Sequence, residues 1–283
     1  PAAVAARWLI VSGGSMVKAA TPMLEVKRLH KVYADASRTV EAIRNVSLSV
    51  GEGELVCIVG PSGAGKTTLL KCIAGLLAPS SGEIVLEGQR VVGPPPSMAV
   101  VFQEYGRSLF PWMSVRDNVA LPLKQKKMDA ARREELVRNA LSAVDLAGVE
   151  GAYPWQLSGG MQQRVAIARA VAYEPHVLLM DEPFAAVDAQ TRADLEDLIR
   201  VLWRRLRVTV LFVTHDIDES VYLGQRVLVL SHAPTVIMED VGIDLPDERT
   251  QLETRSMARF GELRKHIYSK IQLAKQGWRP PSE

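Results

Sequence analysis

Three segments of this chain are largely apolar, and each is as short as a β-strand. They span Leu55–Val59, Val177–Met180 and Val208–Thr214. A strand with one wet face alternates apolar and polar residues, whereas a strand buried on both faces is apolar throughout. The pattern therefore predicts three central strands in a sheet that is covered on both sides.

Other predicted strands follow a different pattern. Val46, Leu48 and Val50 alternate with polar residues, which indicates a second sheet with one face in water. The outer strands are predicted from β-favouring runs bounded by turn residues. They are Leu24–Tyr33, Val40–Val50, Glu83–Val92, Ala99–Phe102, Val227–Leu230 and Thr235–Met238.

Helical periodicity appears between the strands. Leu195, Leu198, Ile199, Leu202 and Leu206 recur at the spacing of one helix face. Similar patterns predict helices over 66–77, 134–147, 161–173 and around 260–271. Because strands alternate with helices, we expect an α/β fold with a mostly parallel sheet and right-handed crossovers.

Composition limits the class of partner. The chain has 283 residues and a formal net charge of +2 at pH 7, too close to neutral to indicate nucleic acid. Cys57 and Cys72 have apolar neighbours and no metal-binding spacing, which favours reduced thiols in a cytoplasmic protein. No segment approaches the ~20 apolar residues that span a bilayer. We therefore expect a cytoplasmic chain, without a nucleic-acid partner, that reaches the membrane through another protein.

A glycine-rich loop follows the first buried strand and precedes a predicted helix. It fits the P-loop pattern in full, and the strand before it and the helix after it are the required context. Its glycines let backbone N–H groups approach phosphate oxygens, and the helix N-terminus adds partial positive charge. We expect Lys66 to reach the β- and γ-phosphates and Thr67 to bind Mg²⁺. The candidate phosphate-binding residues are Gly60, Pro61, Ser62, Gly63, Ala64, Gly65, Lys66, Thr67 and Thr68.

Polar residues also end the other predicted strands. Asp181 and Glu182 follow Val177–Met180, so Asp181 is a candidate Mg²⁺ ligand and Glu182 a candidate to orient the attacking water. His215 ends the third buried strand and is expected to touch the γ-phosphate and support Glu182. Gln103 follows a shorter strand, and its amide oxygen is a further candidate for Mg²⁺. Alone, Gln103 and His215 are weak signals, because most such residues are exposed or structural.

A second motif, Leu157-Ser158-Gly159-Gly160, opens another predicted helix. Ser158 can cap this helix, and the two glycines expose backbone N–H groups. The motif is therefore a second anion-binding terminus in a chain that already has a P-loop. It is either a capped helix only, or a clamp for the γ-phosphate held by a neighbouring subunit.

Taken together, these motifs resemble those of the ATP-hydrolysing subunit of ABC transporters over roughly residues 22–240. The resemblance implies ATP and Mg²⁺ as ligands, with a P-loop NTPase core, an N-terminal antiparallel β subdomain and an inserted helical subdomain. It also implies that Tyr33 stacks on adenine, that Val40 contacts the base or ribose, and that Asp188 lies in a loop communicating across a dimer. Met161 and the loop residues Phe184–Val187 depart from the commonest family pattern, and neither departure removes a catalytic group.

The resemblance further implies a domain plan and partners. We expect a flexible tail over 1–21, an ATP-binding domain over 22–240 with its helical subdomain at about 104–174, and a helical extension over 241–283. Two such subunits would pair head to tail, with ATP between one P-loop and the other subunit's Ser158, Gly159 and Gly160. Transmembrane permease subunits and, indirectly, a substrate-binding protein would complete the assembly, on the inner face of the membrane.

Met161 and the segment from Leu109 to Val119 resemble the branch that imports nitrate, sulfonates and taurine. Tyr105, Leu109, Phe110, Trp112 and Met113 look exposed and are a candidate groove for the permease, with ordinary packing as the alternative. A soluble ABC ATPase without a permease is a competing hypothesis, although such proteins generally carry insertions or tandem cassettes. A regulatory module would be expected to lack Lys66, Glu182 or His215, and a simple P-loop kinase would leave Ser158–Gly160 unexplained.

Overall fold

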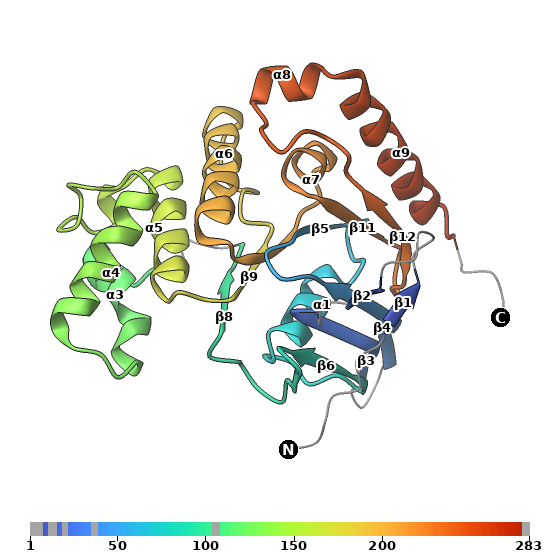
Figure 1. The fold of residues 1–283 in the computed structure, drawn as a ribbon, viewed down its shortest axis with the longest axis horizontal. Helices are drawn as coiled ribbons and strands as arrows, with labels where there is room; N and C mark the ends of the chain where they lie inside the picture. Colours follow the sequence, from blue (N-terminus) through green and yellow to red (C-terminus); the bar gives the residue numbers. More distant parts are fainter. Residues whose placement is uncertain (1–7, 11–15, 19–21, 35–38, 104–107, 279–283) are drawn as a thin grey trace.

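The computed structural model describes residues 8–10, 16–18, 22–34, 39–103 and 108–278. A six-stranded sheet forms the centre, with helices of the second half of the chain on one face and helix α1 and a smaller sheet on the other (Figure 1). The helices α3, α4 and α5 form a separate group beside this centre (Figure 1). The predicted α/β class with a P-loop core, an antiparallel N-terminal sheet and an inserted helical part is confirmed.

The central sheet is mostly parallel. Its pairings β11–β5, β5–β10, β10–β9 and β9–β8 are parallel, whereas the edge strand β12 is antiparallel to β11. Because parallel neighbours share a direction, β5, β9 and β10 end at the same edge. In spatial order the strands are β12 (Ile237–Gly242), β11 (Arg226–Leu230), β5 (Leu55–Val59), β10 (Thr209–Val213), β9 (Val177–Asp181) and β8 (Met98–Val101).

The smaller sheet is antiparallel and has the order β4-β3-β6-β7. Its strands are β3 (Leu24–Ala34), β4 (Thr39–Val50), β6 (Ser81–Leu86) and β7 (Gln89–Arg90). The single strand predicted over Glu83–Val92 is therefore wrong, because the chain reverses after Leu86. Glu87 and Gly88 both have positive φ, at 50° and 77°, which is the backbone form of a two-residue hairpin turn.

Strands β1 (Trp8–Ile10) and β2 (Met16–Lys18) pair with each other in a two-stranded antiparallel sheet. The rest of residues 1–21 lies outside the described residues, so the flexible tail stays a prediction. The division at residue 240 also stays a prediction, and β12 runs across that position.

The helices largely follow the predicted periodicity. Helix α1 is shorter than predicted, because Gly75 has φ +69° and ends the helix after Ile73. Helix α5 starts at Gly159 rather than Met161, which places both glycines of the Leu157–Gly160 motif, hereafter the signature motif, in its first turn. The helices are α1 (Lys66–Ile73), α3 (Val115–Ala120), α4 (Ala130–Ala143), α5 (Gly159–Ala172), α6 (Ala189–Leu206), α7 (Ile217–Leu223), α8 (Gln251–Ser256) and α9 (Ala258–Lys275), with 3-10 turns η1 (Leu121–Gln125) and η2 (Pro154–Gln156).

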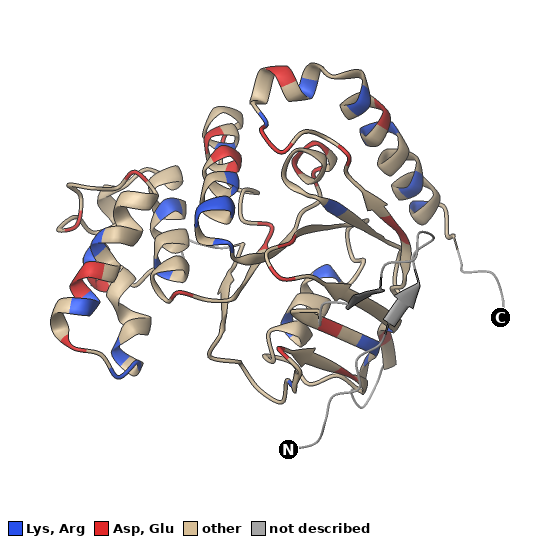
Figure 2. Ribbon diagram, in the orientation of Figure 1, with Lys and Arg blue, Asp and Glu red and all other residues tan. Residues whose placement is uncertain are grey.

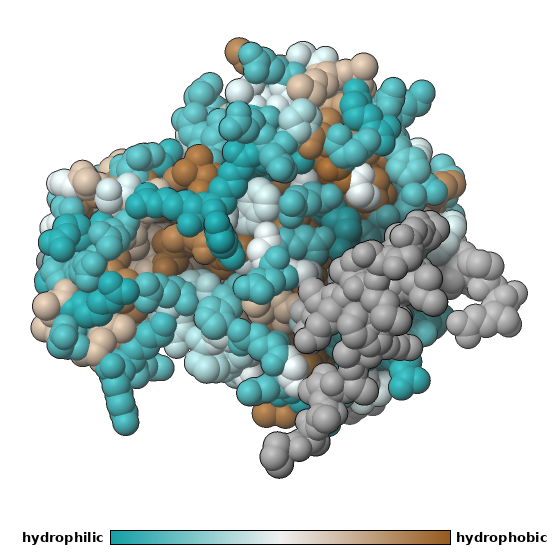
Figure 3. All heavy atoms as spheres, viewed as in Figure 1, coloured by the Kyte–Doolittle hydropathy of each residue, from teal (hydrophilic) through white to brown (hydrophobic). Residues whose placement is uncertain are grey.

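Charge is spread over the molecule rather than gathered by sign. Figure 2 shows acidic and basic residues mixed along α6 and α9. On the face drawn in Figure 3, hydrophobic side chains form small groups among hydrophilic ones. The mixed charges in Figure 2 agree with the near-neutral net charge of +2.

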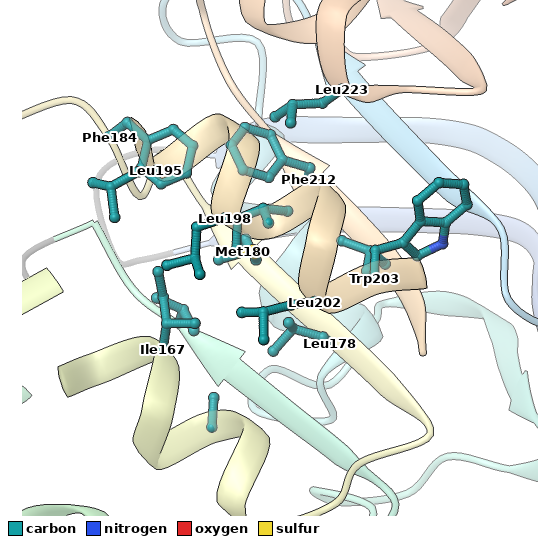
Figure 4. Close-up of a cluster of buried hydrophobic side chains, with 14 of the residues drawn as sticks. Ile167, Leu178, Met180, Phe184, Leu195, Leu198, Leu202, Trp203, Phe212 and Leu223 are labelled. Atoms are coloured by element: carbon teal, nitrogen blue, oxygen red, sulfur yellow. The ribbon is translucent and has the colours of Figure 1, made fainter. Parts of the chain in front are cut away.

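Alternate residues of the central strands enter two separate cores. On β5, Leu55, Cys57 and Val59 pack toward the helices α5, α6 and α7, whereas Val56 and Ile58 pack toward α1 and the smaller sheet. All five residues are fully buried, which confirms the predicted strand with two covered faces. Figure 4 shows the first core, where side chains of α6 meet those of β9 and β10. The labelled residues are Ile167, Leu178, Met180, Phe184, Leu195, Leu198, Leu202, Trp203, Phe212 and Leu223.

The close approach of β6 to β3 requires a glycine at position 82. Gly82 has φ +85°, and a Cβ there would lie 2.3 Å from the backbone oxygen of Arg28. We expect Gly82→Ala to lower the free energy of unfolding by at least about 2 kcal/mol, because it adds both backbone strain and a clash. Chemical denaturation measures this change.

Gly242→Ala is the matched control, since Gly242 also lies in a strand and a Cβ there would meet no atom within 4 Å. Its unfolding free energy should stay within about 0.5 kcal/mol of the parent. Equal effects of the two substitutions would contradict the packing argument.

Candidate active site

One cavity of about 920 Å³ lies at the carboxyl edge of the central sheet. It brings together side chains from segments that are far apart in the sequence. The predicted site residues that line it are Tyr33, Val40, Gly60, Pro61, Ser62, Gly63, Ala64, Gly65, Lys66, Thr67, Thr68, Gln103, Glu182 and His215. Asp181, Ser158, Gly159, Gly160 and Asp188 do not line it.

The loop from Gly60 to Gly65 has the backbone form that a phosphate cradle needs. Gly63 and Gly65 have φ values of +76° and +71°, in the region that glycine adopts with little cost. Gly65 is the N-cap of α1, so the first N–H groups of that helix face the loop. Thr235 holds the loop from the side by donating its hydroxyl proton to the backbone oxygen of Ala64.

Lys66, Glu182 and His215 form a contiguous polar group. The Lys66 ammonium donates to the backbone oxygens of Gly60 and Pro61 at 3.1 and 3.2 Å, and lies 3.6 Å from Glu182 Oε1. His215 Nδ1 lies 2.9 Å from Glu182 Oε2. Lys66 is buried and His215 is exposed, so the group reaches from the interior to the open side of the cavity.

Glu182 has an unusual backbone conformation. Its φ is +44°, which is costly for a residue with a side chain and is often found at functional sites. Its N–H donates to Val213 at 2.8 Å, which ties the end of β9 to the end of β10. This link places the Glu182 backbone beside the end of β10, and the 2.9 Å contact with His215 positions its carboxylate.

Thr67, Asp181 and Gln103 supply the oxygen donors expected of a magnesium site. The Thr67 hydroxyl donates to Asp181 Oδ1 at 3.3 Å. Thr67 and Gln103 line the cavity, whereas the buried Asp181 does not line it and is linked to it through Thr67. Burial raises the pKa of the Asp181 carboxyl, and the Thr67 hydrogen bond partly offsets this. Hydroxyl, carboxylate and amide oxygens are the hard ligands that Mg²⁺ prefers, so these residues fit the ion.

Tyr33 and Val40 lie on neighbouring strands at another side of the cavity. The two residues are paired across β3 and β4, and the Tyr33 hydroxyl lies 3.2 Å from Thr68 Oγ1. Tyr33 is 43% exposed, so its ring is accessible for stacking on a planar base. Residues 35–38, between these strands, lie outside the described residues.

The signature residues and Asp188 form a separate site within the subunit. Ser158 caps α5 by accepting from the N–H of Met161, and Asp188 caps α6 by accepting from Thr191. A Cβ at Gly160 would lie 2.5 Å from the Thr191 methyl group, so the two helix starts touch. Hydrogen bonds from Thr191 hold the pKa of Asp188 below its ordinary value. Sequence reasoning missed Thr191, which connects the two motifs.

The candidate permease groove is smaller than predicted. Trp112 is 72% exposed, and its ring centroid lies 5.3 Å from that of Phe110. Leu109, expected to be exposed, is buried in the core with α3, because the chain turns inward at this residue. Tyr105 lies outside the described residues.

Comparison with known proteins decides the family. The ABC transporter family profile matches residues 43–185. The nitrate import ATP-binding protein NrtD of Synechocystis is 47% identical over 228 residues, which cover 80% of this chain and 85% of that protein. The chain belongs to the ABC transporter family.

Other similarities agree with this membership. The aliphatic sulfonates import ATP-binding protein SsuB of Bacillus cereus is 39% identical over 88% of this ABC ATPase and 96% of its own length. A dimeric post-hydrolysis ATP-binding cassette bound to ADP and Pi superposes with a TM-score of 0.69 at 32% identity, covering 78% of this chain and 99% of that one. The family and these similarities make this chain a nucleotide-binding ATPase.

None of the helices in the described part of the chain has the length and apolar character that a membrane span requires.

A buried carboxyl group supports the His215 loop of this ABC ATPase from behind. Glu219 on α7 accepts the Thr214 hydroxyl proton at 2.6 Å, and Thr214 Oγ1 accepts the N–H of Asp216 at 2.9 Å. Burial raises the pKa of Glu219 to about 7, whereas the Thr214 hydrogen bond acts in the opposite direction. Protonation of Glu219 therefore occurs next to the loop that carries His215.

This carboxyl group makes stability depend on pH. The native pKa of about 7 lies above the ordinary value of 4.5, so the native state holds a proton that the unfolded chain has lost. The stabilisation is complete below pH 4.5 and is lost as pH rises through 7. Between pH 5 and 8, the unfolding free energy of the parent should fall by roughly 2 kcal/mol more than that of Glu219→Gln.

Denaturation at several pH values measures this difference. Replacing Glu52, an exposed carboxylate on a turn, with Gln serves as the control and should leave the parent's pH profile unchanged. Parallel profiles for the parent and Glu219→Gln would contradict the assignment.

Proposed function

We propose that this chain hydrolyses ATP in the cavity at the sheet edge and thereby powers import of a small compound through a membrane permease. One observation carries the proposal. A single cavity is lined by the P-loop, the Lys66 ammonium, the Glu182 carboxylate and His215. A nucleotide-binding module would need the loop alone, whereas a carboxylate held beside the lysine suits attack by water.

Hydrolysis needs positioning more than covalent chemistry. Lys66 and the loop N–H groups offset the negative charge that develops on the phosphates. Glu182 orients the attacking water and polarises it, and His215 fixes the Glu182 carboxylate through the 2.9 Å contact. Mg²⁺ held by Thr67, Asp181 and Gln103 would supply charge neutralisation between the β- and γ-phosphates.

The signature residues act on a second copy of the chain. Ser158, Gly159 and Gly160 begin α5 and lie outside the cavity of their own subunit. Their backbone donors suit a phosphate held by the partner's P-loop, because charge-assisted hydrogen bonds of this kind are strong. Asp188 adjoins them through Thr191, so both motifs face the same interface. ATP would close the homodimer and hydrolysis would release it.

The transported compound is proposed to be a small anion. The names of similar proteins specify nitrate and aliphatic sulfonates, and taurine is a related sulfonate. Recognition would reside in a separate substrate-binding protein and in the permease. The ATPase would sit on the inner membrane face through that permease, with Trp112 at the docking surface.

Loss of the Glu182 carboxylate tests the catalytic role. We expect Glu182→Gln to bind Mg-ATP with near-parental affinity and to hydrolyse it at least ~100-fold more slowly, because the variant cannot polarise water. A phosphate-release assay and fluorescent-nucleotide titration measure the two quantities. Turnover equal to that of the parent would refute the role of Glu182.

Lys66→Ala is the companion variant. It removes the ammonium at the phosphate loop, so binding itself should be lost. The pair of variants separates binding from chemistry, because only the lysine variant should fail in the titration. A lysine variant that binds ATP normally would contradict the assignment of the loop.

Trp112 tests the permease partner. Trp112→Asp should lower co-purification with a co-expressed candidate membrane permease about tenfold, because it places a charge in an apolar docking surface. Val201→Asp, on α6, is the control for another exposed apolar residue (59% exposed). Failure of the parent chain to co-purify with the permease would instead favour a soluble ABC ATPase.

A further inference from the structure

The C-terminal helix α9 reaches the nucleotide cavity. Figure 1 shows it passing from α8 along the outside of the molecule toward β11 and β12. Four of its residues line the same cavity as Lys66 and Tyr33, and they are Tyr268, Ile271, Gln272 and Lys275. Their spacing of three and four residues places them on one face of the helix, which we call the cavity stripe.

The position of this stripe is fixed by the rest of the helix. Phe260, Leu263, Ile267, Ile271 and Ala274 are buried against the main body. Ion pairs add to this anchor, since Lys270 and His266 contact the two carboxylate oxygens of Glu239 on β12 at 2.9 and 2.8 Å. These contacts hold the pKa of Glu239 below its ordinary value, although burial acts in the opposite direction. The second half of α9 is therefore part of the cavity wall.

The cavity stripe carries solvent-accessible donors that no other group in the described part of the chain occupies. Tyr268 is 54% exposed, and Lys275 is also exposed. Among the described residues, no side-chain hydrogen bond or ion pair is formed by Tyr268, Gln272 or Lys275, whereas most polar groups of α9 on the Glu239 side are paired. An ammonium, an amide and a phenol facing one cavity suit a ligand with negative charge and hydrogen-bond acceptors, as an adenine nucleotide has.

We propose that α9 completes the nucleotide site, with Gln272 and Lys275 donating hydrogen bonds to the bound adenine nucleotide and Tyr268 packing against it. This inference rests on the proposed ATP-binding role of the cavity. The C-terminal extension is thus a part of the binding site in the same subunit. It supplies a second lysine, from a segment remote from the P-loop, to a ligand that Lys66 already contacts.

Binding of Mg-ADP to the full-length chain tests the inference. The diphosphate is chosen because it reports contacts within one subunit without the ATP-driven dimer. The double variant Gln272→Ala plus Lys275→Ala should raise the calorimetric dissociation constant about tenfold, since it removes a charged and a neutral hydrogen bond. Tyr268→Ala should weaken binding by a smaller factor. The thermal unfolding midpoint of these variants without nucleotide should equal that of the parent, because Ala favours the helix.

A matched control uses the same residue types outside the stripe. Lys265 on α9 and Gln276 just after it are exposed and do not line the cavity, so Lys265→Ala plus Gln276→Ala should bind Mg-ADP like the parent. Equal dissociation constants for the stripe variant, the control and the parent would overturn the inference.

The outcomes also separate this inference from the proposed function. If the parent binds Mg-ADP and Lys66→Ala does not, the nucleotide binds in the P-loop cavity. The dissociation constant of the stripe variant then tests the contribution of α9 separately. If the parent fails to bind any adenine nucleotide, the proposed function fails, and the inference about α9 fails with it.

Discussion

The parallel pairing of β5, β10 and β9 is the constraint on which the rest of the molecule depends. Their registers place the three strand ends at one edge, so Gly60, Glu182 and His215 meet although the sequence separates them widely. Burial on both faces makes this arrangement rigid, because each strand contributes to two cores. A catalytic group built on such strands is held without help from the ligand.

The same edge explains why the motifs divide into two sets. The P-loop, Glu182 and His215 face the cavity, while Ser158 and Asp188 cap helices that meet each other through Thr191. A single subunit therefore carries both the P-loop and the signature motif, but the two motifs do not line the same cavity within that subunit. This division favours a head-to-tail pair, in which the γ-phosphate is bound from both sides and its loss weakens the contact.

Much of the fold was predictable from the sequence because the signals were local and consistent. The apolar run Leu55–Val59 and the loop after it defined both a strand and its chemistry. The hairpin at Glu87–Gly88 was missed, because the apolar residues of Glu83–Val92 concealed a turn that depends on positive φ values. The early end of α1 depends on tertiary contact, since Gly75 lies against the backbone of Gly93.

Site residues that belong to a sequence motif were predictable, whereas residues that reach the site only through the packing of the fold were not. Thr191, and the cavity-lining residues Ile217 and Ala233, belong to no motif, and their positions follow from how loops and helices pack. The sequence predicted a helix around 260–271, but it did not predict that Gln272 and Lys275 of α9 line the cavity. Burial of the adjacent face, which shares Ile271 with the stripe, turns the stripe toward the cavity, and burial is a property of the whole fold.

Light scattering on a hydrolysis-deficient chain tests the central claim most directly. With saturating Mg-ATP, Glu182→Gln should have twice the mass of a single chain, and adding Ser158→Lys should return it to the single mass, because the bulky side chain blocks the partner's phosphate. A single mass for Glu182→Gln under these conditions, with nucleotide bound, would contradict the sandwiched triphosphate.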